Sequence, residues 1–110
     1  MEVISMGNVF DSDGKSMFTF GKATTYSDGK SSHMSGFGNT QMLYSNGRTS
    51  YKFGNTYNIG STSFYKNGNM VTGNGKTYIQ NGSMVTSSDG KSWYNVESED
   101  DLFRILEDDN

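Results

Sequence analysis

Tyr26-Ser27-Asp28-Gly29-Lys30 and, after one short strand, Phe37-Gly38-Asn39-Thr40 are the stretches that decide the fold, because similar pairs of turns recur along the chain. Asp-Gly or Asn-Gly pairs stand at residues 13–14, 28–29, 46–47, 67–68, 81–82 and 89–90. Such pairs tolerate the positive φ that both central residues of a type I′ hairpin turn require. Turns about seven to ten residues apart leave room for strands of about four to six residues. The sequence therefore predicts an up-and-down antiparallel meander built from hairpins.

The side chains between these turns alternate with a period of two, as they do in a strand. Phe18 and Phe20 fall on one face of their strand, and Tyr51 and Phe53 fall on one face of theirs. We expect the opposite faces, which carry Ser, Thr, Lys and Asn, to be solvated. The fold class is therefore all-β, as a thin or single-layer sheet or a small barrel-like sheet.

The last 14 residues have a different pattern, which is that of a short helix. Ser98 followed three positions later by Asp101 resembles a capping box, and acidic residues in the first turn favour the helix dipole. Leu102, Ile105 and Leu106 then share one side of the helix. We predict a helix of about two to three turns that covers part of the sheet with its apolar stripe.

The composition indicates one small domain that has an uneven distribution of charge. Residues 1–96 carry eight Lys and Arg against five Asp and Glu, whereas residues 97–110 carry Arg104 against seven acids. We divide the chain into a β-hairpin repeat domain (1–96) and an acidic C-terminal helix and tail packed on the sheet (97–110). The absence of cysteine, of a signal peptide and of a long apolar run leads us to expect a cytoplasmic protein without membrane contact.

The alternation of Tyr-Ser-Asp-Gly-Lys-Ser with Phe-Gly-Asn-Thr over residues 20–57 resembles short Tyr/Gly/Ser/Asp β-repeat proteins of enterobacteria and of their plasmids and phages. That resemblance implies a β-repeat fold and an origin in a bacterium or a mobile element, and it implies no activity. A weaker similarity to cell-wall choline-binding repeats, through residues 69–73 and 91–94, lacks the Gly-Trp pair of that family.

No arrangement of residues in the sequence indicates catalysis, a metal or a cofactor. His33 is the one histidine, and a strand residue that faces solvent is the simplest interpretation of it. Asp11-Ser12-Asp13-Gly14 lacks the later oxygen ligands of a calcium loop. The repeated Gly-Lys-Ser/Thr triplets lack both the upstream glycine and the following helix of a phosphate-binding loop. We therefore expect a protein that is not an enzyme.

Three kinds of binding remain open. The leading hypothesis is a protein-binding module, specifically a phage or mobile-element inhibitor of a host complex that defends the cell and handles nucleic acid. Nucleic acid could instead stack on Tyr side chains that have cations nearby, and a cell-surface or carbohydrate-binding repeat protein is the third possibility. A homodimer through the sheet edges is also possible.

Two sets of residues are the candidate partner-binding sites. The acidic set could present a negative surface to a basic site on a partner. It consists of Glu97, Glu99, Asp100, Asp101, Glu107, Asp108 and Asp109. The sheet-face set consists of Tyr44, Tyr51, Lys52, Tyr65 and Trp93. For the nucleic-acid alternative, the cations are Lys30, Arg48, Lys52, Lys66, Lys76 and Lys91.

Overall fold

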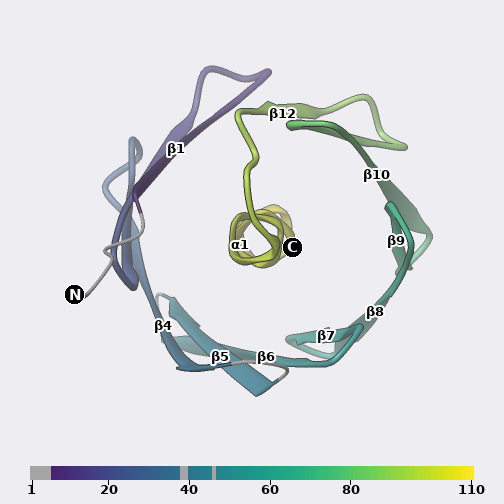
Figure 1. Cartoon of the computed structure of the whole chain (residues 1–110), viewed down its shortest axis with the longest axis horizontal. Coiled ribbons are helices and arrows are strands. Elements are labelled where there is room, and N and C mark those ends of the chain that lie inside the picture. The colour runs from purple at the N-terminus through teal and green to yellow at the C-terminus, as the bar shows by residue number, and fades with distance from the viewer. Residues whose placement is uncertain (1–5, 38–39, 46) are drawn as a thin grey trace.

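Twelve antiparallel strands form a closed barrel around one C-terminal helix in the computed structural model, which describes residues 6–37, 40–45 and 47–110 (Figure 1). The strands are β1 (Met6–Asp11), β2 (Ser16–Phe20), β3 (Ala23–Tyr26), β4 (Ser31–Phe37), β5 (Thr40–Ser45), β6 (Arg48–Phe53), β7 (Thr56–Ile59), β8 (Thr62–Asn67), β9 (Met70–Gly73), β10 (Lys76–Asn81), β11 (Met84–Ser87) and β12 (Ser92–Tyr94). The helix is α1 (Glu99–Asp109). The predicted all-β meander with a short C-terminal helix is confirmed.

The first and last strands pair with each other and close the sheet. Phe10 lies opposite Tyr94, and Asp11 lies opposite Trp93. Every other strand pairs with its neighbours in the sequence. Because each described strand has a partner on both sides, the unpaired edges on which the predicted edge-to-edge homodimer depends are absent from this part of the chain. That prediction of a dimer interface is therefore corrected.

The turns differ from the predicted type I′ geometry. Among the turns that the structure describes, only Asn74-Gly75 has positive φ at both central residues, at 52° and 73°. In the Asp28-Gly29 turn only the glycine has positive φ, and Tyr26 N–H donates to Lys30 O at 3.0 Å, as in a three-residue loop that has glycine in the left-handed position. Two-residue loops such as Gly68-Asn69 place glycine first, which is the type II′ pattern. The predicted turns at 38–39 and at Asn46 lie outside the described residues.

The two faces of the sheet are the reverse of those expected. Phe18 and Phe20 are exposed on the outer wall at 46% and 54%, whereas the alternate residues Met17 and Thr19 are buried inside the barrel. Likewise Ser50 and Lys52 point inward from β6, although polar side chains of this kind were expected to be solvated. The physical reason is the helix, because its carboxylates compensate inward cations such as Lys52 and its apolar side chains pack against inward rings such as Tyr57.

The helix lies inside the ring of strands and is not laid over the outside of the sheet (Figure 1). Its apolar residues are at most 2% exposed: Leu102, Phe103, Ile105 and Leu106. Phe103 packs against Tyr57, with ring centroids 5.5 Å apart. Each such side chain gains about 1.5–3 kcal/mol from full burial. The barrel and the helix therefore share one core. This packing stabilises the helix, which would be too short to be stable on its own.

The predicted N-cap of the helix is present. Ser98 has extended backbone dihedral angles, and its hydroxyl accepts a hydrogen bond from Asp101 N–H at 3.2 Å. Asp101 returns a bond one residue further back than in a capping box, since its carboxylate accepts from Glu97 N–H at 3.1 Å. Within the described part of the chain, no helix is long and apolar enough to cross a lipid bilayer.

Candidate interaction surfaces

The helix carboxylates and the strand cations meet at the two mouths of the barrel. At the N-terminal end of α1, the carboxylate of Glu99 lies 3.1 Å from Lys52 Nζ and 2.6 Å from Lys66 Nζ. These hydrogen bonds, from Lys66 and then from Lys52, lower the pKa of Glu99. Lys52 is 4% exposed, so its ammonium group is held inside the barrel by this contact.

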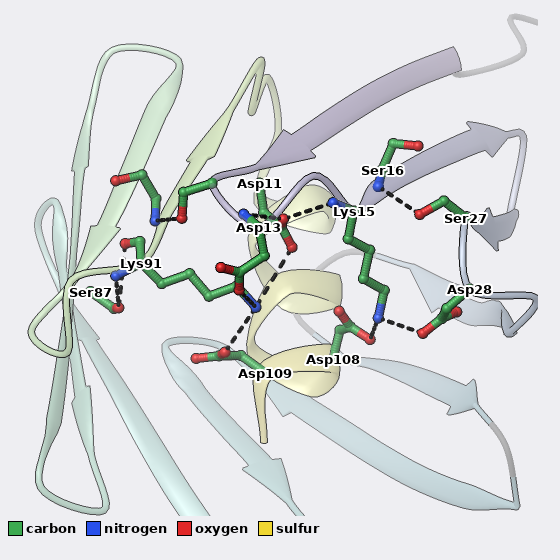
Figure 2. A network of polar contacts seen from close by, with 12 residues as sticks. Asp11, Asp13, Lys15, Ser16, Ser27, Asp28, Ser87, Lys91, Asp108 and Asp109 are labelled. Carbon is green, nitrogen blue, oxygen red and sulfur yellow. Dashed lines mark hydrogen bonds and ion pairs between the residues drawn. The ribbon is translucent and has the colours of Figure 1, made fainter.

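A larger network surrounds the C-terminal end of α1 (Figure 2). Asp108 contacts Lys15 at 2.7 Å, and Asp109 lies 3.0 Å from Lys76 and 3.6 Å from Lys91. Lys15 and Lys91 reach the helix from opposite sides, out of the first and the last Asp-Gly turn of the chain (Figure 2). Segments that are far apart in the sequence are therefore joined through the helix.

The three lysines of this network hold their protons firmly. Burial acts against the charged form of Lys15, but hydrogen bonds to Asp108 and to Asp28 outweigh it and raise the pKa of Lys15. Burial likewise opposes charge on Lys76 and Lys91, and the nearby carboxylates, Asp109 among them, raise the pKa of both.

Inward-facing aromatic rings lie under the ammonium groups. Lys15 Nζ lies 5.2 Å from the ring centroid of Tyr26, and Lys91 Nζ lies 5.3 Å from that of Trp93. Cation–π attraction of this kind adds to the ion pairs, and its strength increases where water is excluded. Lys15 therefore contacts both the ring of Tyr26 and the carboxylate of Asp108. Lys91 likewise contacts the ring of Trp93 and the carboxylate of Asp109.

Arg48 caps the helix C-terminus. Its guanidinium pairs with the carboxylate of Glu107, and it donates to the backbone oxygens of Glu107 and of Asn110, the latter at 3.2 Å. Acidic residues at this end of a helix are unfavourable, because the dipole places negative charge there. The inward cations of the strands offset that repulsion.

The structure corrects the expected negative surface. Asp101 and Glu107 are buried, and the side chains of Asp108 and Asp109 are only 10% and 9% exposed. These four carboxylates form ion pairs within the barrel and are therefore not available to a partner. Of the rest of the acidic set, Glu97 and Glu99 are exposed and Asp100 is half-buried at the N-terminal mouth, where partner binding by them stays a prediction.

The predicted sheet-face set is divided by the pleat. Tyr44, Tyr51 and Tyr65 stand on the outer wall at 57%, 40% and 58% exposure. Lys52 and Trp93 point into the barrel, at 4% and 1%, and cannot form part of an outer binding face. The outward part of the predicted sheet-face set is therefore limited to Tyr44, Tyr51 and Tyr65.

Met42 and Phe53, which were not selected from the sequence, are exposed on the outer wall like the three tyrosines. The aromatic face, as we name it, consists of Met42, Tyr44, Tyr51, Phe53 and Tyr65. Met42 lies opposite Tyr51 across β5 and β6, and the rings of Tyr51 and Phe53 are stacked at 6.2 Å. The strand alternation contained the signal for Phe53, and only the assignment of that face to the outside was missing.

The outer wall around the aromatic face carries no charge. Among the described residues of β4 to β8 whose side chains point outward, none is Lys, Arg, Asp or Glu. The charged residues of these strands, Arg48, Lys52 and Lys66, all point inward to helix carboxylates. Interface cores are typically depleted of charge and enriched in aromatic residues and Met, and the aromatic face has a similar composition.

The cations considered for nucleic acid are engaged in ion pairs. Five of them contact helix carboxylates, and Lys30 lies 4.0 Å from Asp28. Each therefore has a carboxylate close by, with Lys52 and Lys66 sharing Glu99, and this pairing reduces the attraction for phosphates on which nucleic-acid binding depends.

His33 stands on the outer wall, opposite Ala23 on one side and Tyr44 on the other. The carboxylate of Asp11 accepts hydrogen bonds from the N–H groups of Asp13 and Lys15, both at 2.9 Å, so it closes its own turn. Within the described ranges, no three His, Asp or Glu residues gather as metal ligands would.

Comparisons with models of known protein families, with curated proteins and with solved structures found no match to this chain. The class that the fold defines is a closed antiparallel barrel filled by its own C-terminal helix, and its candidate site is an uncharged outer surface.

Proposed function

We propose that the chain is a non-enzymatic protein-binding module that docks through its aromatic face. The observation that supports this proposal most strongly is the combination of five large, about half-exposed side chains with an outer wall free of charge over β4 to β8. Tyr supplies contact area at low entropic cost, and neighbouring Ser, Thr and Asn supply adaptable hydrogen bonds, as in antibody paratopes.

The size of the aromatic face supports the same proposal. A large aromatic side chain buries about 150–250 Å², so five that are about half exposed offer roughly 500 Å². Apolar patches of about 300–600 Å² are the largest found on typical monomers and are often functional. Standard interfaces bury about 800 Å² on each partner. The aromatic face is therefore large enough to be the core of such an interface and needs a polar rim to complete it.

The more specific role expected from the sequence is inhibition of a host defence complex that handles nucleic acid by a protein of a phage or mobile element. In this proposal the contact with the host complex shifts from the acidic tail to the aromatic face, because most of the tail carboxylates are engaged inside the barrel. The nucleic-acid alternative is weakened by the paired cations, and the carbohydrate alternative loses Trp93 as an exposed platform.

The test compares two matched substitutions on the outer wall. Tyr51→Ser removes a member of the aromatic face, whereas Tyr94→Ser removes a similarly exposed tyrosine, at 44%, from β12. Bacterial proteins retained by the wild type would be purified, and their affinity for the wild type and for each variant would be measured by calorimetry. We expect Tyr51→Ser to weaken binding by about tenfold or more.

Two results would contradict the proposal. Equal affinity of a purified partner for both variants would mean that the aromatic face does not bind it. Binding of oligonucleotides that disappears at high salt, with no protein partner retained, would favour the nucleic-acid alternative.

A further inference from the structure

A hollow of about 270 Å³ opens on the outer wall beside the aromatic face, over β3, β4 and β5. Its outward-facing lining residues are Ala23, Thr25, Ser31, His33 and Tyr44. Tyr44 also belongs to the aromatic face. A single partner could therefore cover the aromatic face and fill the hollow.

Differences in side-chain size create this hollow. Thr25 lies opposite Ser31 across β3 and β4, so two small side chains form its floor. On the far side, Phe18 of β2 lies opposite Thr25 and is 46% exposed. On the near side, His33 lies opposite Tyr44. Phe18 on β2 and Tyr44 on β5 are three strand spacings apart, which is roughly 14 Å, so these taller side chains flank a groove of about that width.

The chemistry of the lining restricts what can enter. No lining residue is Lys, Arg, Asp or Glu, so a charged group that entered would lose water without gaining an opposite charge. The hydroxyls of Thr25 and Ser31 can each donate or accept one hydrogen bond at the floor. An uncharged group with an apolar body and one polar atom fits these conditions.

The volume indicates a single side chain. Pockets for whole drug-sized ligands run from about 300 to 1,000 Å³, so this hollow lies below that range. Tyr and Trp combine a large apolar ring with one polar atom, and they are frequent anchors at the centres of protein interfaces.

We propose that the hollow receives one tyrosine or tryptophan side chain from the protein that docks on the aromatic face. This inference rests on the proposed function and specifies the chemistry of the partner. The partner presents an exposed aromatic side chain within an uncharged patch, because the residues that line the hollow offer no counter-ion to a charge beside the anchor.

The first experiment uses small probes and does not require the partner. Amide NMR spectra of the folded chain would be recorded during titration with p-cresol and with 3-methylindole, which stand for the tyrosine and tryptophan side chains. We expect saturable shifts at Ala23, Thr25 and His33. N-propylguanidinium and methyl glucoside serve as the charged probe and the sugar probe, and we expect neither to shift these amides.

Matched variants locate the binding. Thr25→Leu fills the floor of the hollow, and Thr72→Leu makes the same change at an exposed position on β9. We expect Thr25→Leu to weaken binding of the aromatic probes by about tenfold and Thr72→Leu to leave it unchanged. Thermal unfolding of both variants checks that the barrel is intact.

Unchanged probe binding by Thr25→Leu would overturn the inference, as would stronger binding of the guanidinium or the sugar probe than of the aromatic probes. A purified partner separates the two proposals. If Tyr51→Ser loses the partner while Thr25→Leu keeps it, only the hollow is wrong. If neither variant changes the affinity, the proposed function fails as well.

Discussion

Asp109 is the helix residue that binds the most partners in the interior, so Asp109→Asn tests whether the helix is held by charge. Its carboxylate accepts a hydrogen bond from the hydroxyl of Tyr78 at 2.6 Å. The same carboxylate lies 3.0 Å from Lys76 Nζ and 3.6 Å from Lys91 Nζ. The side chain is 9% exposed, and those of the two lysines are about a quarter exposed. The substitution keeps the shape of the side chain and removes its charge.

The expected loss follows from these contacts. Making the hydrogen bond from Tyr78 neutral costs about 1 kcal/mol, the difference between charged and neutral bonds. The loss of two partly buried ion pairs costs about 1.5 kcal/mol in total, near the upper end of the range for exposed pairs. Removal of negative charge from the helix C-terminus returns about 0.5 kcal/mol. We therefore expect the free energy of unfolding to fall by about 2 kcal/mol, or Tm by about 8 °C.

The assay is urea unfolding followed by Trp93 fluorescence, because this indole is 1% exposed in the folded barrel and becomes solvated on unfolding. Asp13→Asn is the matched control. Asp13 also pairs with Lys91, at 3.5 Å, but its side chain is 73% exposed, so we expect a change below about 0.5 kcal/mol. If Asp109→Asn costs no more than Asp13→Asn, the dipole repulsion cancels the ion pairs and the reasoning is refuted.

Two further predictions concern buried tyrosines. Among the described residues, the buried hydroxyl of Tyr57 has no hydrogen-bond partner, so Tyr57→Phe should raise the free energy of unfolding by about 1 kcal/mol. Tyr78→Phe should lower it, because Asp109 loses its donor, and equal effects in urea unfolding would contradict this. Burial raises the pKa of Tyr26 to about 12, and carboxylates raise that of Lys76 against the effect of burial. The stability that these two groups contribute should be complete below about pH 10, and it should be lost as pH rises through their pKa values in the folded protein. Constant stability from pH 8 to 11.5 would exclude this, and Tyr26→Phe should reduce the decline.

The turn spacing was enough to predict the strands, because glycine with positive φ is a local requirement. The exact turn types were predicted less well. In the Asp28-Gly29 turn the glycine alone takes positive φ, since a three-residue loop demands only one such position. The helix start at Ser98 was also predictable, since an N-cap depends on residues that are neighbours in sequence.

The candidate site was harder to predict, because strand alternation defines two faces without stating which one is buried. Tyr51 and Lys52 were grouped as one binding surface, yet they point to opposite sides of β6. Pairing of the first strand with the last is a long-range contact that no local pattern encodes, and it removed the edges proposed for dimerisation.

The sequence alone determined the local features of this protein: short strands, glycine turns, and a capped helix with acids at both ends. Only the tertiary structure decided that the sheet closes around that helix. Once Asp108 and Asp109 are enclosed, Lys15 and Lys76 must face inward to compensate their charge. The pleat then turns the uncharged aromatic residues outward, because neighbouring side chains on a strand point to opposite faces.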